Sequence, residues 1–343
     1  MNKGKLPENA LKRSVLRQLK TKRQEVVSSA EVGMDCALFS VDSKSGAADL
    51  CSCMQEAAVV SEAERFGSKK QYAVTMPQLI QRCANNLAAG GGSIFAVEIC
   101  LLLPEGTEEP EVRTLMQEAE SACKELQIQI AGGQTRITEA VTSPIAVITG
   151  LGHVVLQKAK KPAPGMDVVI SKWIGLEGTA QLAGRFREDI ITRYPQYLVD
   201  EAALFERYRS VLPEAATAVK SGVCMMHDLS EGGVFASLWE LAQRAGVGLT
   251  IDLKKIPLRQ ETVEVCEFCG VNPYELLSGG SLLMLAEDGP GLVLTLEEAG
   301  IPASIIGKVT DSNDKIILNE DEVRYMDRPK RDALFGCLES FES

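Results

Sequence analysis

The stretch Met226-His227-Asp228-Leu229-Ser230-Glu231-Gly232-Gly233 contains the pattern that decides the fold. It follows the apolar run 223–226 and precedes residues 233–245, whose apolar side chains have helical spacing. The pattern therefore predicts a strand, a loop and a helix. A glycine pair that opens a helix lets backbone N–H groups approach an anion, with the positive end of the helix behind them. Asp228 is a hard oxygen ligand of the kind magnesium uses, or it could equally cap the helix.

Other segments also combine glycine with small polar or acidic residues at the ends of predicted elements. They are Gly33-Met34-Asp35-Cys36-Ala37, residues 84–92 with Asn85, Asn86 and three glycines, Ala131-Gly132-Gly133-Gln134-Thr135, and Ser278-Gly279-Gly280-Ser281. Each of them suits a phosphate ligand physically, but a glycine pair alone is more often a turn. None is a Walker A loop or a G-x-G-x-x-G fingerprint.

Between these segments, apolar periodicity alternates between the helical and the extended kind. It predicts helices over 75–89 and 110–126, a largely helical stretch over 200–221, and strands over 93–103 and 145–155. A strand over 128–130 is expected to end on the pair Gly132-Gly133. The pattern favours α/β or α+β layers in both halves of the chain. The lysine-, proline- and glycine-rich stretch 158–165 is the expected boundary, which gives domains 1–157 and 166–335.

Composition limits the possible function classes. The 343 residues carry a formal net charge of -11, which repels nucleic-acid backbones, so no nucleic-acid partner is expected. No apolar run approaches the roughly 20 residues of a membrane helix, and the basic N-terminus lacks a secretory apolar core. We therefore expect a cytoplasmic protein. Its ten cysteines fit that compartment as small buried residues, and Cys266-x-x-Cys269 is expected to be one face of a short helix rather than a zinc site.

The order of these segments resembles the superfamily of aminoimidazole ribonucleotide (AIR) synthase, the PurM-like superfamily, from Gly4-Lys5-Leu6-Pro7 to about Val309. Within it, the HypE-like branch of hydrogenase maturation factors is the most similar. The segments that carry this likeness are 101–106, 175–180, 226–233 and 277–283, together with Ile256-Pro257 and Asn272-Pro273.

The resemblance implies a fold, a cofactor and partners. The N-terminal domain would be a ferredoxin-like α/β unit that pairs with a second copy in a homodimer, and the C-terminal domain a separate α/β unit. ATP with Mg²⁺ would lie in the cleft between them, for phosphotransfer or dehydratase-type chemistry that could serve hydrogenase maturation with a maturation-protein partner. The implied phosphate-binding residues are Asn86, Gly132, Gly133, Gln134, Thr135, Gly232, Gly233, Gly279 and Gly280. The implied metal ligands are Asp35, Glu56 and Asp228.

The acidic positions depart from the family pattern at two places. Asn86 stands where the family has the aspartate of Asn-Asp, and Gln134 where it has that of Gly-Gly-Asp-Thr. Glu56 is only loosely aligned with a further family aspartate. Amides add no negative charge, so the loss weakens a magnesium site by several kcal/mol, on the order of a buried charge pair. Cys337, near the C-terminus, lacks the proline-arginine-isoleucine context of the HypE acceptor cysteine and is expected to be structural.

Two hypotheses follow. The first is an active ATP-dependent enzyme with a modified metal site. The second is a catalytically weakened scaffold that binds a nucleotide or another metabolite and acts through protein partners. The intact glycine loops favour the first, and Asn86 with Gln134 favours the second.

Overall fold

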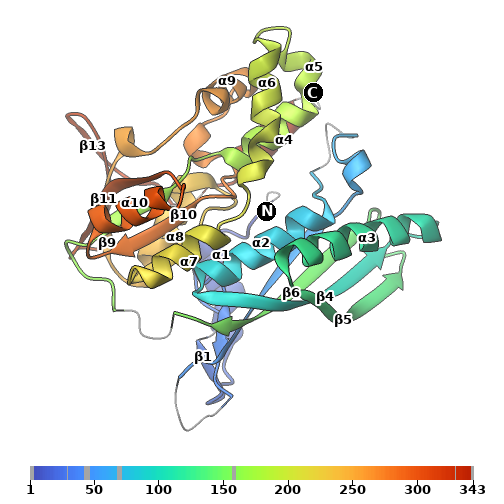
Figure 1. Ribbon diagram of the computed structural model, residues 1–343, viewed down its shortest axis with the longest axis horizontal. Coiled ribbons are helices and arrows are strands. Elements are labelled where there is room, and N and C mark those ends of the chain that lie inside the picture. The colour runs from blue at the N-terminus through green and yellow to red at the C-terminus, as the bar shows by residue number, and fades with distance from the viewer. Residues whose placement is uncertain are drawn as a thin grey trace.

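The protein is described by a computed structural model that covers residues 4–28, 30–41, 47–67, 72–156, 160–328 and 330–340. It contains a six-stranded and a seven-stranded sheet, each with its own helices. This confirms the predicted α/β architecture of two units (Figure 1). Residues 157–159, at the predicted boundary, lie outside the described residues. None of the helices in the described ranges combines the length and the apolar character that a membrane crossing requires.

The first sheet has the strand order β1-β2-β3-β6-β4-β5. Its strands are β1 Val26–Ser28, β2 Ala37–Phe39, β3 Leu50–Ala58, β4 Gly92–Leu103, β5 Gln129–Ile137 and β6 Ile145–Val154. Two helices, α2 Met76–Ala89 and α3 Glu109–Leu126, cover one face and form the core with it (Figure 1). Helix α2 begins with a capping box, in which Thr75 and Gln78 satisfy each other's backbone N–H groups.

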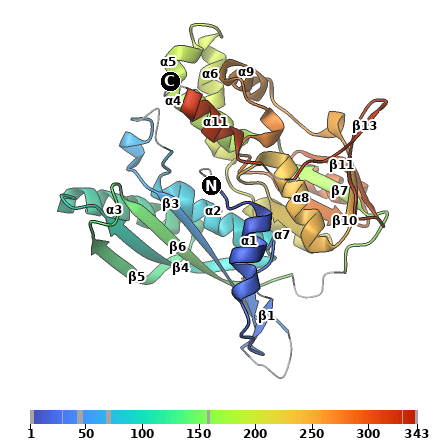
Figure 2. The same ribbon diagram turned by 180° about the vertical axis from the view of Figure 1, so that it is seen from behind.

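Helices α2 and α3 leave the other face of this sheet uncovered (Figure 2). Strand β6 alternates between buried and half-exposed residues along its first eight positions, as expected when one face packs and the other does not. Met54 and Phe95 lie on the open face with large exposed fractions. Strand β5 forms one edge and is exposed along nearly its whole length.

The second sheet has the order β13-β12-β9-β11-β7-β10-β8. Its strands are β7 Asp167–Ser171, β8 Met225–Asp228, β9 Gly248–Asp252, β10 Leu282–Ala286, β11 Ala303–Thr310, β12 Lys315–Asn319 and β13 Glu322–Tyr325. Strands β7 and β10 are buried at every position. Helix α8 Gly233–Ala245 covers one face, and α7 Leu212–Lys220 with α10 Gly289–Glu298 covers the other.

A separate group of helices packs around α4 (Figures 1 and 2). They are α4 Leu176–Arg185, α5 Arg187–Ile190, α6 Gln196–Ala203, α9 Gln260–Cys269 and α11 Ala333–Ser340. The stretch 200–221, which we expected to be largely helical, does consist mostly of helical segments. It is divided into α6, a 3-10 turn over 204–208 and α7, and Pro213 begins α7 in the first-turn position that suits proline.

The first described residues cross to the second half of the chain (Figure 2). The backbone N–H of Lys5 donates to Glu231 at 2.7 Å. Helix α1 Glu8–Ser14 follows, and Trp239 on α8 donates its indole N–H to Glu8 at 2.9 Å. A Cβ at Gly4 would lie 3.2 Å from the ring of Phe335, so the two ends of the described chain are neighbours.

Candidate functional site

A buried acidic centre lies where the two halves of the chain meet. Asp35 comes just before β2, and His227 and Asp228 end β8. One ligand atom from each of these three side chains lies within 4.8 Å of the others. The structure therefore brings together Asp35 and Asp228, which are 193 positions apart in the sequence. We use the name acidic centre for these three residues with Asn86 and Arg244.

Both oxygens of Asp35 already have a partner. Its Oδ1 lies 2.7 Å from His227 Nδ1, and its Oδ2 accepts from Arg244 Nη1 at 2.7 Å. Arg244 is in the last turn of α8. Gly33 allows this approach, because its φ is +77° and an added Cβ would lie 2.4 Å from the carbonyl oxygen of Glu240. The loop before β2 can thus lie directly on α8 only with glycine at position 33.

Asn86 occupies the position between Asp228 and β3. The amide orientation that satisfies its neighbours points its nitrogen to both oxygens of Asp228, at 3.0 and 2.9 Å. Its oxygen then accepts from the Gln55 amide. The amide therefore supplies a donor to Asp228, where an aspartate would add a second negative charge.

The structure corrects the prediction that Glu56 is a metal ligand. Neighbouring residues of a strand point to opposite faces of the sheet. In β3 it is Gln55 that reaches Asn86, while Glu56 is exposed. The loose alignment in this segment was one residue off, and a one-residue shift moves a side chain to the other face.

The charges of this centre influence one another. Burial disfavours a charged His227, but the adjacent Asp35 carboxylate and Glu240 outweigh it and raise the pKa of His227 to about 10. Burial, together with the nearby Asp35, raises the pKa of Asp228 to about 8. Burial also acts on Glu240, but Lys5 and His227 outweigh it and lower its pKa to about 2. The centre is therefore a cluster of opposite charges rather than a set of free carboxylates.

Lys5 lies at the rim of the acidic centre. Its ammonium group is 3.3 Å from the Ser230 hydroxyl and 3.5 Å from Glu240. Its side chain keeps 51% of its surface exposed. Lys5 is therefore a cation beside this cluster with access to solvent, next to the loop 229–232.

The donor set of this centre does not fit Mg²⁺ in the arrangement the structure has. Magnesium takes octahedral oxygen ligands at about 2.0–2.1 Å and usually keeps several waters. Here Asp35 is bound on both oxygens, Asp228 accepts from an amide, and the third group is an imidazole. In this arrangement the protein itself supplies partners to the two carboxyl groups expected to hold Mg²⁺.

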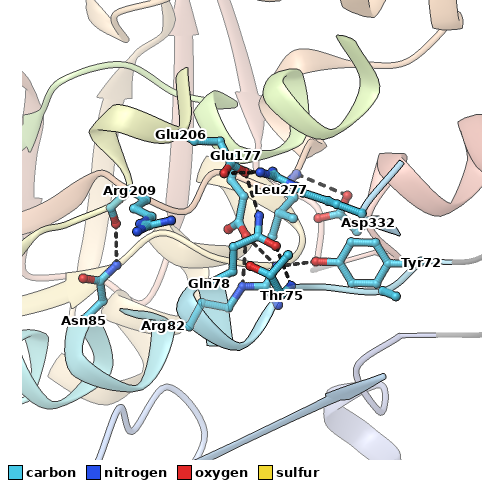
Figure 3. Close-up of polar contacts among 12 residues, drawn as sticks. Tyr72, Thr75, Gln78, Arg82, Asn85, Glu177, Glu206, Arg209, Leu277 and Asp332 are labelled. Atoms are coloured by element: carbon cyan, nitrogen blue, oxygen red, sulfur yellow. Dashed lines mark hydrogen bonds and ion pairs between the residues drawn. The ribbon is translucent and has the colours of Figure 1, made fainter. Parts of the chain in front are cut away.

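A second polar cluster joins the halves along the first turns of α2 (Figure 3). Arg82 donates to Glu177 of α4 at 2.6 Å and also contacts the hydroxyl of Tyr72. Gln78 donates to Glu206 at 2.6 Å, and Arg65 pairs with the same carboxylate. We call these residues the arginine network.

Asn85 continues this contact between α2 and the second half. Its amide nitrogen donates to the carbonyl of Arg209 at 2.7 Å (Figure 3). Its oxygen accepts from the backbone N–H of Val211 at 3.1 Å. Asn85 therefore has a structural role, in contrast to its neighbour Asn86.

The cavity beside this cluster encloses only ≈ 20 Å³. That is about the space of one water molecule. Gly279 lines it, and a Cβ there would lie 2.0 Å from Glu177 Oε2. Gly280 has a φ of +105° and turns against the Tyr208 carbonyl. These two glycines let the loop that follows Ser278 lie close to the arginine network and to the Tyr208 carbonyl.

The other glycine pairs lie apart from one another. Gly232 and Gly233 open α8, and Asp332 accepts from the Gly232 N–H at 2.6 Å. Strand β5 continues through Gly132 and Gly133, so the prediction that it ends there is wrong. Gln134 and Thr135 lie on the same exposed edge strand, whereas Asp35 lies beside β2 near the other edge. One chain therefore does not assemble all the predicted phosphate residues.

Eight of the ten cysteines are buried, and Cys100 and Cys269 are half-buried. Cys266 and Cys269 lie on α9, and all ten thiols are free. Cys337 is buried on α11, and its thiol contacts the thiol of Cys269. This contact, together with burial, raises the pKa of Cys269. In the first half, Cys53 and Cys83 have their sulfurs 3.4 Å apart.

Sequence reasoning missed the cations of the site. His227 stood next to Asp228 in the deciding stretch, so its motif was a usable signal. Arg244 lies 16 positions after Asp228, and Lys5 lies among the first described residues. Only the fold shows that they reach the acidic residues.

Comparison with known proteins agrees with this architecture. A hydrogenase expression/formation protein of Methanocaldococcus jannaschii is 28% identical over 241 residues, which is 68% of this chain and 70% of that protein. The carbamoyl dehydratase HypE of Rhizobium leguminosarum bv. viciae is 26% identical over 238 residues, 66% of this chain and 65% of that protein. The chain thus spans just under two thirds of this second relative.

Solved structures show the same fold. A chain of a HypE-HypF complex superposes with a TM-score of 0.73 at 19% identity, covering 93% of this chain and 100% of that one. HypE in complex with ATP superposes with a TM-score of 0.65 at 16% identity, covering 95% of this chain and 96% of that one. The models of the N-terminal and C-terminal domains of AIR synthase related proteins match residues 33–154 and 163–319. The chain therefore belongs to the AIR synthase related family, in its HypE-like branch.

Proposed function

We propose that this chain is a HypE-like maturation protein that binds a nucleotide through its phosphates at the junction of its two halves. The observation that carries the proposal is the acidic centre, in which residues of both halves meet in a chain whose relatives are hydrogenase formation proteins. Of the similar structures, one is a HypE with ATP and another a HypE-HypF complex. A HypF-type protein is accordingly the partner we propose.

Lys5 and the opening of α8 are the groups proposed to hold phosphate oxygens. Lys5 presents a half-exposed ammonium group beside Ser230, and Gly232 and Gly233 open a helix whose N-terminus favours anions. Bound ATP would supply a transferable phosphoryl group. Since the protein neutralises Asp35 itself, we expect binding to persist while turnover is slow.

A homodimer through the first sheet is part of the proposal. Its open face carries Met54 at 61% exposure and Phe95 at 40%. Phe95 packs against His153 in a tilted arrangement, with ring centroids 4.7 Å apart, so this face presents large side chains that a second copy could cover. The exposed edge β5, with Gly132, Gly133, Gln134 and Thr135, could approach a nucleotide only if it came from a second copy. The predicted phosphate residues would then be shared between protomers.

The second candidate function is the weakened scaffold. Asn86 and Arg244 favour it, because both replace a metal-binding feature with a protein donor. Such a protein would bind a nucleotide and a maturation partner without hydrolysing ATP.

Calorimetry separates the two candidates. We expect ATP to bind the wild-type chain with and without Mg²⁺, and Lys5→Met to weaken binding by about tenfold, the loss of one charged contact. Lys12→Met is the matched control, because Lys12 is similarly exposed and, among the described residues, pairs with Glu8 on α1. Rapid phosphate release with Mg²⁺ would favour the enzyme, and bound ATP that stays intact would favour the scaffold. No heat with ATP or ADP would refute nucleotide binding.

Light scattering after size exclusion tests the dimer. Met54→Glu should halve the mass, because a charge would be buried at the interface. Val323→Glu is the control, since Val323 is equally exposed, at 63% against 61%, but lies on β13 of the other sheet. A wild-type monomer would contradict the proposal.

A further inference from the structure

The acidic centre contains its own cation. Arg244 Nη1 lies 2.7 Å from Asp35 Oδ2 and 3.4 Å from the Met226 carbonyl oxygen. The side chains of Asp35 and Arg244 are 4% and 15% exposed. A guanidinium group keeps its charge at every accessible pH, so Asp35 has a permanent counter-charge from within the chain.

The contact is built by the backbone and is not a chance encounter of surface groups. Arg244 and Asp35 come from different halves of the chain, 209 residues apart. The loop that carries Asp35 reaches α8 because Gly33 lies against the Glu240 carbonyl. A cation in the last turn of a helix is favourable by itself, but that effect does not require a carboxylate from the other half to approach it.

Asn86 completes the replacement at the second carboxylate. Its amide donates to both oxygens of Asp228, and Gln55 fixes the amide from behind. An aspartate at position 86 would place a further negative charge against Asp228 and would require a cation between them. The amide removes that requirement, so each carboxylate of the centre has a partner supplied by the chain.

We propose that Arg244, together with Asn86, takes the place of a divalent cation at the Asp35–Asp228 pair, so that this centre is assembled without metal. A cation could enter only after the guanidinium left Asp35, which would leave a buried arginine without its partner. The inference goes beyond the proposed nucleotide binding. It is tested without nucleotide, so that either can fail alone.

The experiment titrates Mn²⁺ alone into purified protein and follows free Mn²⁺ by electron paramagnetic resonance. We expect no stoichiometric binding to the wild type up to about 1 mM, the range of weak protein sites. Arg244→Lys keeps the charge and should behave the same. Arg244→Gln combined with Asn86→Asp should bind one Mn²⁺ at least about tenfold more tightly than the wild type. Adding Asp35→Asn to that pair should abolish the gain.

Two results would overturn the proposal. One is a wild type that binds one Mn²⁺ at micromolar concentration and loses it in Asp35→Asn. The other is a folded double variant, judged by circular dichroism, that gains no Mn²⁺ binding. If the double variant does not fold, the comparison of wild type with Asp35→Asn still decides, because absence of binding in both supports the proposal.

Discussion

The acidic centre and the arginine network both join the two halves of the chain, but their charges are balanced in opposite ways. In the arginine network a cation of one half meets an anion of the other, as Arg82 meets Glu177. In the acidic centre the two halves contribute carboxylates, Asp35 and Asp228, and Arg244 and His227 are needed to offset them. In the arginine network the two halves therefore attract each other directly. The acidic centre depends on additional residues, so it should respond more strongly to conditions such as pH.

Breaking the arginine network should have the largest effect on stability. Arg82→Met leaves Glu177 buried without its partner, and we expect the free energy of unfolding to fall by about 3–5 kcal/mol in urea denaturation. Restoring balance with Glu177→Gln in the same chain should recover most of it.

Arg113→Met provides the control for that prediction. Arg113 pairs with Glu109 on the exposed face of α3, so its loss should cost no more than about 0.5 kcal/mol. If the two arginine variants lose equal stability, the arginine network does not hold the halves together.

Gly33→Ala should have the next largest effect, because it separates the halves at the acidic centre. The new Cβ collides with the Glu240 carbonyl, and the positive φ adds strain, for a total of about 2–3 kcal/mol. Gly222→Ala has a similar φ, +74° against +77°, but nothing within 4 Å, so it should cost only about 1 kcal/mol. Thermal unfolding of the pair isolates the collision, and equal shifts would show that Gly33 does not lie against α8.

The pH dependence should distinguish the two clusters. Because the pKa of His227 is raised to about 10, its stabilisation is complete below its ordinary value of 6.5 and is lost as pH rises through 10. The free energy of unfolding should therefore fall between pH 6.5 and 10, by up to about 1.4 kcal/mol per pH unit. His227→Gln should flatten that slope and His153→Gln, on the open sheet face, should keep it. An unchanged slope in His227→Gln would show that His227 does not cause the pH dependence of stability.

The smallest stability effect is expected at the rim. Lys5→Met should cost about 0.5 kcal/mol and lose that difference in high salt, since Lys5 is half exposed and lies 3.5 Å from Glu240. A salt-independent loss of several kcal/mol would place Lys5 with the buried members of the centre.

The sequence allowed most of the fold to be predicted because its elements are locally encoded. The helix expected over 110–126 is α3, and the strand over 93–103 is β4, each displaced by one residue at its start. The continuation of β5 through two glycines could not be seen locally, since parallel pairing with β4 outweighs the glycine preference for turns.

The site was predictable only in part, for a physical reason. Asp35 and Asp228 stand in motifs, so their meeting could be expected. Of the cations, His227 stands in the same motif as Asp228, whereas Arg244 stands in none. From the sequence, Arg244 is indistinguishable from any basic residue at the end of a helix. Gln55, and not Glu56, points toward Asn86, because neighbouring strand residues face opposite sides of the sheet. Charge balance in a buried cluster depends on three-dimensional neighbours, which spacing along one chain does not specify.

The contact between Gly4 and Phe335 has a consequence for how the chain could be reconnected. Neighbouring ends permit circular permutation, in which the old ends are linked and new ends are opened elsewhere. A break between β6 and β7 would place the first described residues in covalent continuity with the half on which they already lie. Such a permutant would show whether the order of the two halves along the chain matters once their contacts exist.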